Sequence, residues 1–178
     1  MMTQIRPEPG EYAPFYAKYI ALVPEGDLFD TLQASIDDWK SLLGGLTESQ
    51  SEFRYEPAKW SFKEVIGHVT DTERIFSYRI LRIARGDQTP LSGFEQDDYV
   101  KEGNFSVRKL PEVLGEFSAV RHSTLALLRS LSAPAWARRG NANQKEVTVN
   151  ALAFIIAGHE RHHRSIVEQR YLPVLPRA

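Results

Sequence analysis

The chain has 178 residues, with 22 Lys or Arg, 23 Asp or Glu, five His and no Cys. The length suits one domain, and the formal charge of -1 gives no electrostatic reason to expect nucleic acid or an anionic membrane as a partner. The lack of Cys excludes disulfides, thiolate metal ligands and a cysteine nucleophile, so any thiol chemistry would use a thiol from outside.

The N-terminal residues 1–26 are expected to form an extension that packs on the rest of the domain. They lack the basic start and apolar run of a signal peptide, and no segment of the chain reaches the ~18 apolar residues of a membrane span, so we expect a cytoplasmic protein. Phe15, Tyr19 and Leu22 fall at near-helical spacing. This spacing predicts a short helix from Pro14 to about Leu22.

Two amphipathic helices are predicted in the first half of the chain. Residues 27–43 carry apolar side chains at spacings of three and four, and the pair Gly44-Gly45 supplies the stop. The second helix opens with Ser61 and Glu64 in the positions of a capping box and continues to near Gly86.

Two more amphipathic helices are predicted in the second half. The third starts around Leu110, with Pro111 at an early position where its missing N–H costs little, and ends by Pro134. The fourth begins near Val149 and ends before Pro173. Four helices that each carry one apolar stripe predict an all-α protein built as a four-helix bundle.

Two connections stand out between these helices. Residues 87–109 form a longer link than adjacent bundle helices usually need, and such loops often cover sites. Residues 138–148 could form a short hairpin or an irregular excursion around Gly140 and Asn141, and the pattern does not decide between them.

Three of the five histidines lie in the fourth helix, at His159, His162 and His163. At 3.6 residues per turn, His159 and His163 differ by about 40° around the helix axis, so both imidazoles can face one ion. Both share the interior stripe with Leu152 and Ile156. His162 lies about 100° from His163, toward the edge of the stripe, and we favour His163 as the ligand. The preference is not decisive, because His162 is also close in phase to other apolar residues.

His68 is a candidate third ligand, because its phase on the second helix lets it face the bundle interior. Taken alone, a histidine on an apolar face is usually a hydrogen-bonded core residue. Burying the His159 and His163 rings without partners would cost free energy at each, which favours a metal site. His159, Glu160 and His163 also match the His-Glu-x-x-His signature of zinc proteases, but no distant third ligand in a protease-like context follows.

Other polar residues could support such a site. Asp71 and Glu160 are close enough in sequence to accept the second ring proton of a ligating histidine, whereas Glu73 is expected on a solvated or salt-bridged helix face, with Arg74 or Arg79 nearby. Arg121 could bind an anionic group of a substrate or pair with a buried carboxylate. His122 has no partner at ligand spacing and is interpreted as a surface or structural histidine.

Several of these residues form a pattern that resembles the DinB-like superfamily, which includes YfiT-like proteins. The similarity covers essentially the whole chain and is carried by Trp60 to His68, Asp71 to Phe76, Arg79, Arg85 to Asp87, Gly93-Phe94, Arg121 with Thr124, Gly158 to His163 and Arg170 to Leu172. The resemblance implies a single domain over 1–178 with an up-down-down-up four-helix bundle. It also implies a divalent metal bound by His68, His159 and His163.

The resemblance further implies an activity. Members with assigned activities include transferases and isomerases that use low-molecular-weight thiols such as bacillithiol or mycothiol, and others are described as metal-dependent hydrolases. We therefore expect a metal-dependent enzyme that activates a thiol or water, with a non-catalytic metal-binding stress-response module as the alternative. No catalytic residue is assigned.

The expected cofactor is a divalent ion, zinc or nickel before iron, because imidazole suits all three. The expected partner is a small-molecule substrate rather than nucleic acid or a membrane. The aromatic N-terminal segment and the habit of the family favour a homodimer.

Overall fold

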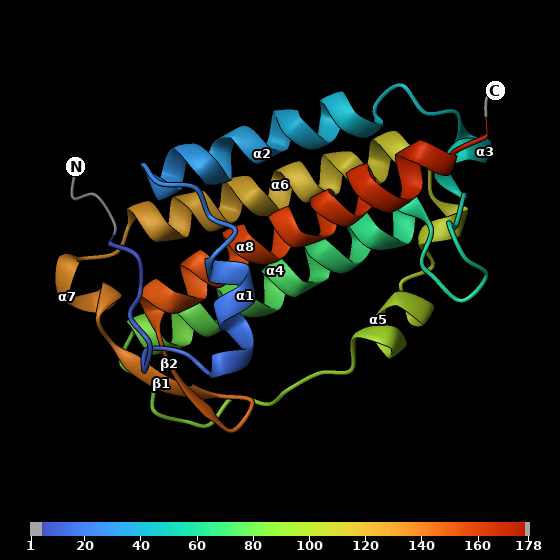
Figure 1. Cartoon of the computed structure of the whole chain (residues 1–178). Helices are drawn as coiled ribbons and strands as arrows, with labels where there is room; N and C mark the ends of the chain where they lie inside the picture. The colour runs from blue at the N-terminus through green and yellow to red at the C-terminus, as the bar shows by residue number, and fades with distance from the viewer. Residues whose placement is uncertain (1–4, 177–178) are drawn as a thin grey trace.

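Four long helices form the body of the protein in a computed structural model that describes residues 5–176 (Figure 1). They are α2 (Leu28–Leu43), α4 (Phe62–Ala84), α6 (Leu110–Arg129) and α8 (Val149–Ile166). α2 and α8 run in one direction along the bundle, and α4 and α6 run in the other. Both α2 and α4 pack against α6 and α8. The expected up-down-down-up four-helix bundle is confirmed.

The helices begin at the predicted signals. Asp27 caps α2 by accepting hydrogen bonds from two backbone N–H groups. At the start of α4, Ser61 accepts from the backbone N–H of Glu64 and the Glu64 carboxylate accepts from the N–H of Ser61, which is the predicted capping box. α6 ends at Arg129, and Pro134 lies in a separate short helix, α7 (Ala133–Trp136).

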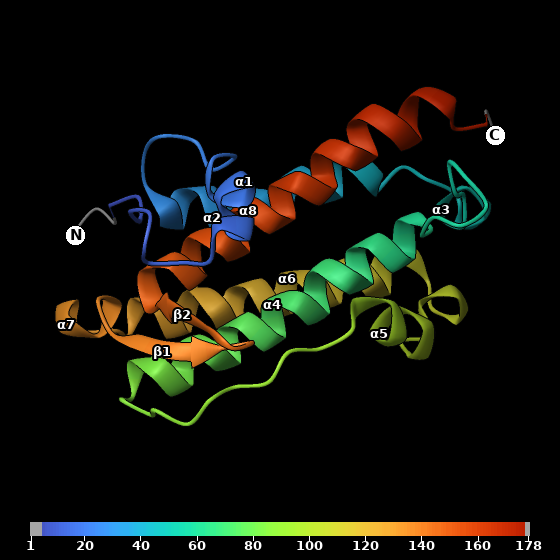
Figure 2. The same cartoon turned by 60° about the horizontal axis from the view of Figure 1, so that its bottom comes forward.

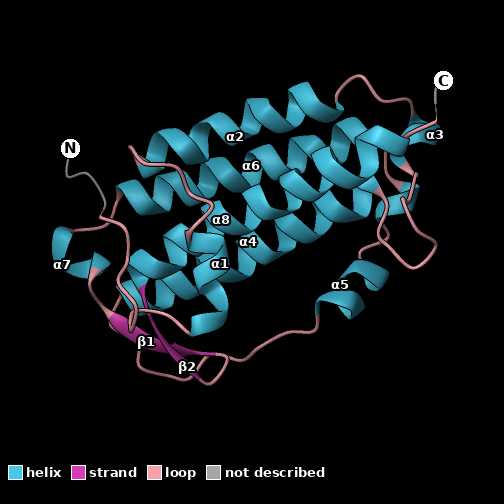
Figure 3. Ribbon diagram, viewed as in Figure 1, coloured by secondary structure: helices cyan, strands magenta, loops and turns pink. Residues whose placement is uncertain are grey.

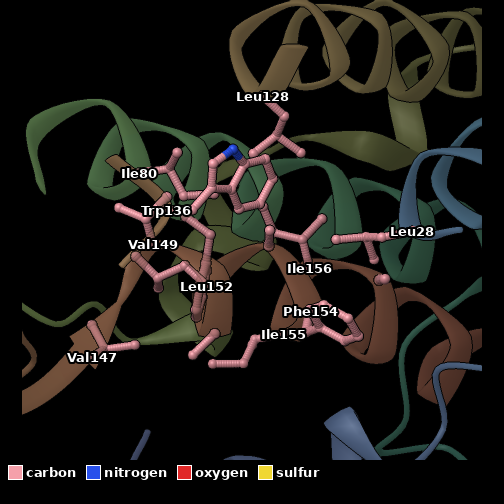
Figure 4. Close-up of a cluster of buried hydrophobic side chains, with 14 of the residues drawn as sticks. Leu28, Ile80, Leu128, Trp136, Val147, Val149, Leu152, Phe154, Ile155 and Ile156 are labelled. Atoms are coloured by element: carbon pink, nitrogen blue, oxygen red, sulfur yellow. The ribbon is translucent and has the colours of Figure 1, made fainter. Parts of the chain in front are cut away.

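The apolar side chains form two clusters along the bundle. The larger cluster lies toward α7, and Figure 4 shows Leu28, Ile80, Leu128 and Leu152 from the four long helices together with Trp136. The second lies toward the other end and contains Trp39, Phe62, Val69, Phe117 and Val167. On each long helix a buried polar residue separates the two clusters, namely Ser35, Glu73, Arg121 and Glu160. A polar layer therefore crosses the middle of the bundle.

The N-terminal segment packs on α8 through α1 (Ala17–Ile20), which directly follows η1 (Pro14–Tyr16). These two elements cover most of the helix that was predicted from Pro14 to about Leu22. The Arg6 guanidinium holds the segment in place by donating to the backbone carbonyls of Ile20 and Val23. Residues 1–4 and 177–178 of the expected single domain lie outside the described residues.

Short elements fill the connections. The long link between α4 and α6 contains α5 (Gln96–Glu102) and η2 (Phe105–Val107), and Figure 2 shows it returning along the bundle. Residues 138–148 form a hairpin rather than an irregular excursion. Its strands β1 (Arg139–Ala142) and β2 (Lys145–Thr148) are antiparallel, as Figure 3 shows. The remaining elements are α3 (Glu48–Ser51), η3 (Val167–Tyr171) and η4 (Leu172–Val174). Within residues 5–176, no helix is both long and apolar enough to cross a membrane.

Candidate metal centre

Three histidine rings from two neighbouring helices meet beside the polar layer. The Nε2 atom of His159 lies 3.1 Å from Nε2 of His68 and 3.1 Å from Nε2 of His163. One ring nitrogen from each of the three histidines lies within 4.8 Å of the others. Tetrahedral zinc with bonds of 2.0–2.1 Å to nitrogen places its ligand atoms about 3.3 Å apart, so this spacing fits a metal ion.

Hydrogen bonding among the rings does not account for the cluster. Both short contacts use the same atom, Nε2 of His159, and a neutral imidazole nitrogen is either one donor or one acceptor. It therefore cannot satisfy His68 and His163 together. A cation that accepts one lone pair from each ring would satisfy all three nitrogens, so the donor set fits a divalent ion.

Burial keeps these imidazoles in the form that binds metal. Burial lowers the pKa of His68 to about 4. Burial, with smaller contributions from the neighbouring imidazoles, lowers the pKa of His159 and of His163 well below the ordinary value. All three rings are therefore neutral near pH 7, and metal binding there requires no loss of ring protons.

Aromatic side chains hold the cluster from two sides. The Trp60 ring centroid lies 4.6 Å from that of His68 and 6.2 Å from that of His163. On the other side, Tyr19 of α1 packs edge-on against His159, with centroids 5.4 Å apart. His162 contacts Tyr19 at 5.2 Å but lies outside the group of converging nitrogens. The cluster thus contains His163, as the helical phase favoured.

A cavity of about 350 Å³ borders the cluster at His68 and His159. Phe76 and Arg79 of α4 form part of its wall. Other parts of the wall come from distant segments of the chain and include Tyr16, Tyr19, Phe94 and Asn143. Residues 93–97 belong to the long link, so that loop forms part of the cavity wall. A cavity of this size can take a small organic molecule.

The two carboxylates expected beside the ligands have other partners. Asp71 accepts a hydrogen bond from Arg74 at 2.9 Å. Glu160 is buried, its carboxylate lies 3.4 Å from Nε of Arg164, and its Oε1 has no hydrogen bond. Among the hydrogen bonds of residues 5–176, neither carboxylate reaches an imidazole. Glu160 is one residue from His159, about 100° around the helix, and therefore faces the bundle interior rather than the ring cluster.

Arg121 pairs with a buried carboxylate, which is the second of its two predicted roles. It is completely buried, and its guanidinium donates to the Glu73 carboxylate from Nε at 2.8 Å and from Nη2 at 2.7 Å. A further donor reaches the backbone carbonyl of Leu32 at 2.9 Å. Of the two alternatives for Glu73, the solvated one is wrong, because only 2% of the residue is exposed, and the salt-bridged one holds with Arg121 as the partner. Its buried cationic partner lies 48 positions away, which local spacing does not reveal.

Sequence reasoning also missed residues of the cavity wall. Tyr16 and Tyr19 were assigned only to packing, and Arg79 was considered only as an ion-pair neighbour of Glu73. The two tyrosines lie in the N-terminal segment and Arg79 lies in α4. Residue spacing within either segment cannot show that the two segments meet. His122 is exposed, in agreement with its interpretation as a surface histidine.

The fold and the ring cluster together define the class: an up-down-down-up helical bundle that gathers three imidazoles from α4 and α8 beside a cavity. The DinB superfamily matches residues 31–167, more than half of the chain. The chain belongs to the DinB superfamily.

Solved structures with the same fold include YfiT from Bacillus subtilis, described as a probable metal-dependent hydrolase with an unusual four-helix bundle topology. It aligns with a TM-score of 0.74 and 16% identity over 82% of this chain and 85% of YfiT. A mycothiol-dependent maleylpyruvate isomerase aligns with a TM-score of 0.66 and 12% identity over 88% of this chain and 66% of the isomerase. At these identities the similarity establishes the fold. No curated protein matches in sequence.

Proposed function

We propose that this chain is a metal-dependent enzyme in which His68, His159 and His163 hold a divalent ion that activates a low-molecular-weight thiol, or water, for reaction with a small molecule. One observation carries the proposal: ring nitrogens within 4.8 Å of one another adjoin a cavity of about 350 Å³. A structural metal site needs no such cavity, whereas a reactive site needs room for a substrate beside the ion.

The donor set suits this chemistry. A divalent ion with three neutral imidazole ligands keeps its full charge, and when bound it supplies a Lewis acid that lowers the pKa of a water or thiol. The chain contributes the neutral rings, which the aromatic packing of Trp60 and Tyr19 keeps in place. Because the chain has no Cys, a reacting thiol would come from solution.

The nucleophile distinguishes two versions of the proposal. The structural similarity to a mycothiol-dependent isomerase supports a thiol, and the similarity to YfiT supports water in a hydrolase. We place the thiol first, in an enzyme of the expected S-transferase type that would bind the thiol and a small-molecule substrate together in the cavity. Zinc or nickel is the proposed ion, with iron as a further candidate.

The test begins with elemental analysis of protein purified without a chelator and without nickel affinity resin. About one ion per chain is expected from three converging ligands. Cobalt-substituted protein is then mixed with bacillithiol, mycothiol or a simpler thiol, and a sulfur-to-cobalt charge-transfer band is expected. His162→Ala should behave as the parent protein, and His163→Ala should show no band.

Three outcomes distinguish a thiol-dependent enzyme, a hydrolase and a non-catalytic protein. A band with any of the thiols supports the thiol enzyme. No band, together with metal-dependent cleavage of esters or amides, supports the hydrolase. Bound metal with neither signal contradicts an enzyme and leaves a metal-binding stress-response module.

We also propose that the protein is a homodimer with no nucleic acid or membrane partner. The exposed Phe15 in the N-terminal segment offers an apolar surface. Sedimentation at several concentrations tests the assembly, and a monomer at all concentrations would contradict it.

A further inference from the structure

Arg79 is a buried cation that plays no part in the proposed metal centre. Only 3% of the residue is exposed, and its Nη2 donates to the backbone carbonyl of Ser92 at 2.7 Å. Within residues 5–176, no carboxylate oxygen lies within 4 Å of its guanidinium. Buried arginines are normally paired, as Arg121 is with Glu73. Arg79 therefore lacks the anion that would offset the cost of burying its charge.

The position of Arg79 relates it to the histidine cluster. Arg79 follows His68 by 11 residues, which is about 20° more than three full turns and a rise of about 16 Å along α4. Both residues consequently lie on one face of the helix, with Thr72 and Phe76 between them. All four side chains line the same cavity of about 350 Å³. The cavity thus has a metal-binding group toward one end of this face and a cation toward the other.

Aromatic side chains line part of the wall between the two groups. The Phe76 ring lies 5.0 Å from the Arg79 guanidinium carbon and 6.1 Å, centroid to centroid, from the ring of Tyr16. Phe94 and Ile155 complete this part of the wall. A molecule that fills the cavity would therefore place an apolar or aromatic body between its two ends.

We propose that Arg79 binds a terminal oxyanion of the substrate, so that the substrate is an elongated organic acid whose reacting group lies at the histidine cluster. The position of the reacting group in this proposal rests on the proposed function, in which the histidine cluster holds the metal ion. A guanidinium has five N–H donors, and the Ser92 carbonyl occupies one. The remaining donors suit a carboxylate, which arginine binds in a two-pronged geometry, and they also suit a phosphate.

Two acidic residues at the cavity rim do not replace this anion. Glu95 and Asp97 line the cavity but are exposed, and neither forms an ion pair with Arg79. Their charges remain in contact with water, which weakens their attraction to the guanidinium. If Glu95 were its ion-pair partner, Glu95→Gln would free the guanidinium and strengthen anion binding strongly. Under our proposal this substitution removes a repulsion and strengthens anion binding by a small factor, about 2-fold or less.

The experiment compares 4-phenylbutyrate with its uncharged analogue 4-phenylbutanamide by calorimetric titration of the full-length protein. Both zinc-loaded and chelator-treated protein are titrated. We expect the acid to bind more tightly than the amide in both forms, and Arg79→Gln to weaken the acid about 10-fold or more, as a charge-assisted hydrogen bond predicts. Arg79→Lys should retain part of the preference. A phosphate ester of 3-phenylpropanol distinguishes a phosphate site from a carboxylate site.

Two controls separate binding from folding. Arg82→Gln removes a cation from the same helix that pairs with Asp87 and does not line the cavity, and it should leave the affinity for the acid unchanged. Affinity for the amide should be the same in Arg79→Gln and in the parent protein, which would show that the cavity and the Ser92 loop are intact.

The results that overturn the proposal are also distinct. Equal affinity for acid and amide, no binding of the acid at millimolar concentration, or an equal loss in Arg82→Gln would each refute a role for Arg79 in anion binding. Acid binding that requires zinc and ignores Arg79→Gln would mean that the carboxylate occupies the metal site instead. If the protein binds no metal but Arg79 still selects the acid, the anion site stands and the proposed metal enzyme fails.

Discussion

The backbone carbonyl of Tyr19 lies directly against Gly158, the residue before His159. A Cβ atom at position 158 would be 2.0 Å from the Tyr19 oxygen, which is far inside van der Waals contact. The glycine lets α1 approach α8 closely enough for the Tyr19 ring to pack on His159. One missing methyl group thus allows the N-terminal segment to form part of the cavity wall.

Gly158→Ala should displace α1 from α8, because the obstructing atom is backbone and cannot rotate away. We expect faster amide hydrogen exchange in residues 14–20, while the three histidines still bind metal. Gly115→Ala is the matched control, since a Cβ there meets nothing within 4 Å and alanine favours a helix by roughly 0.5–1 kcal/mol over glycine. Unchanged exchange in Gly158→Ala would contradict the close packing of the two helices.

Each of His68→Ala, His159→Ala and His163→Ala should abolish stoichiometric metal binding, because two imidazoles hold a divalent ion much more weakly than three. His162→Ala should retain about one ion per chain, since its ring lies outside the converging group. The measurement is metal content after dialysis against a metal buffer. Loss of metal in His162→Ala but not in His163→Ala would reverse the choice of ligand.

The metal-free protein should lose stability as the pH falls from about 6.5 to about 4. The pKa of His68 is about 4 in the folded chain and 6.5 in the unfolded chain, so between these values the unfolded chain binds more protons. Stability therefore rises with pH, and the contribution of His68, about 3 kcal/mol at most, is complete above the unfolded pKa.

Urea unfolding of chelator-treated protein at several pH values measures this dependence. His68→Leu should reduce the slope without abolishing it, because the ring at position 68 is gone while His159 and His163 still take up protons on unfolding. Replacement of the exposed His122 by Ala should leave the slope unchanged. Equal slopes for the parent protein and His68→Leu would contradict a neutral, buried His68.

Glu73→Gln should destabilise the fold by about 3–5 kcal/mol, because it leaves the buried guanidinium of Arg121 without its carboxylate. Joint replacement of Glu73 by Leu and Arg121 by Met should cost less than the single change, since neither charge of the pair is left buried without its partner. Glu146→Gln is the control, because its ion pair with Arg139 is exposed and worth less than about 1 kcal/mol. Free energies of unfolding from urea titrations provide the comparison.

Local sequence determined the helices and much of the ring cluster. Capping by Ser61 and Glu64, the stop after Leu43 and the 3.6-residue period act over a few positions, so helix bounds can be worked out from neighbours. The same period placed His159 and His163 on one face. The phase of His68 on its own helix also made it the candidate third ligand, whereas the up-down-down-up order came from the resemblance to the superfamily.

Only the tertiary structure decided which charged residues are buried and what surrounds the histidines. Glu73 is buried because Arg121 of another helix meets it, and an isolated α4 would expose it to water. The cavity exists because Tyr16, Arg79 and Phe94, from three separate segments, come together around one face of α4. Such contacts depend on the packing of whole helices, which no spacing within one segment encodes.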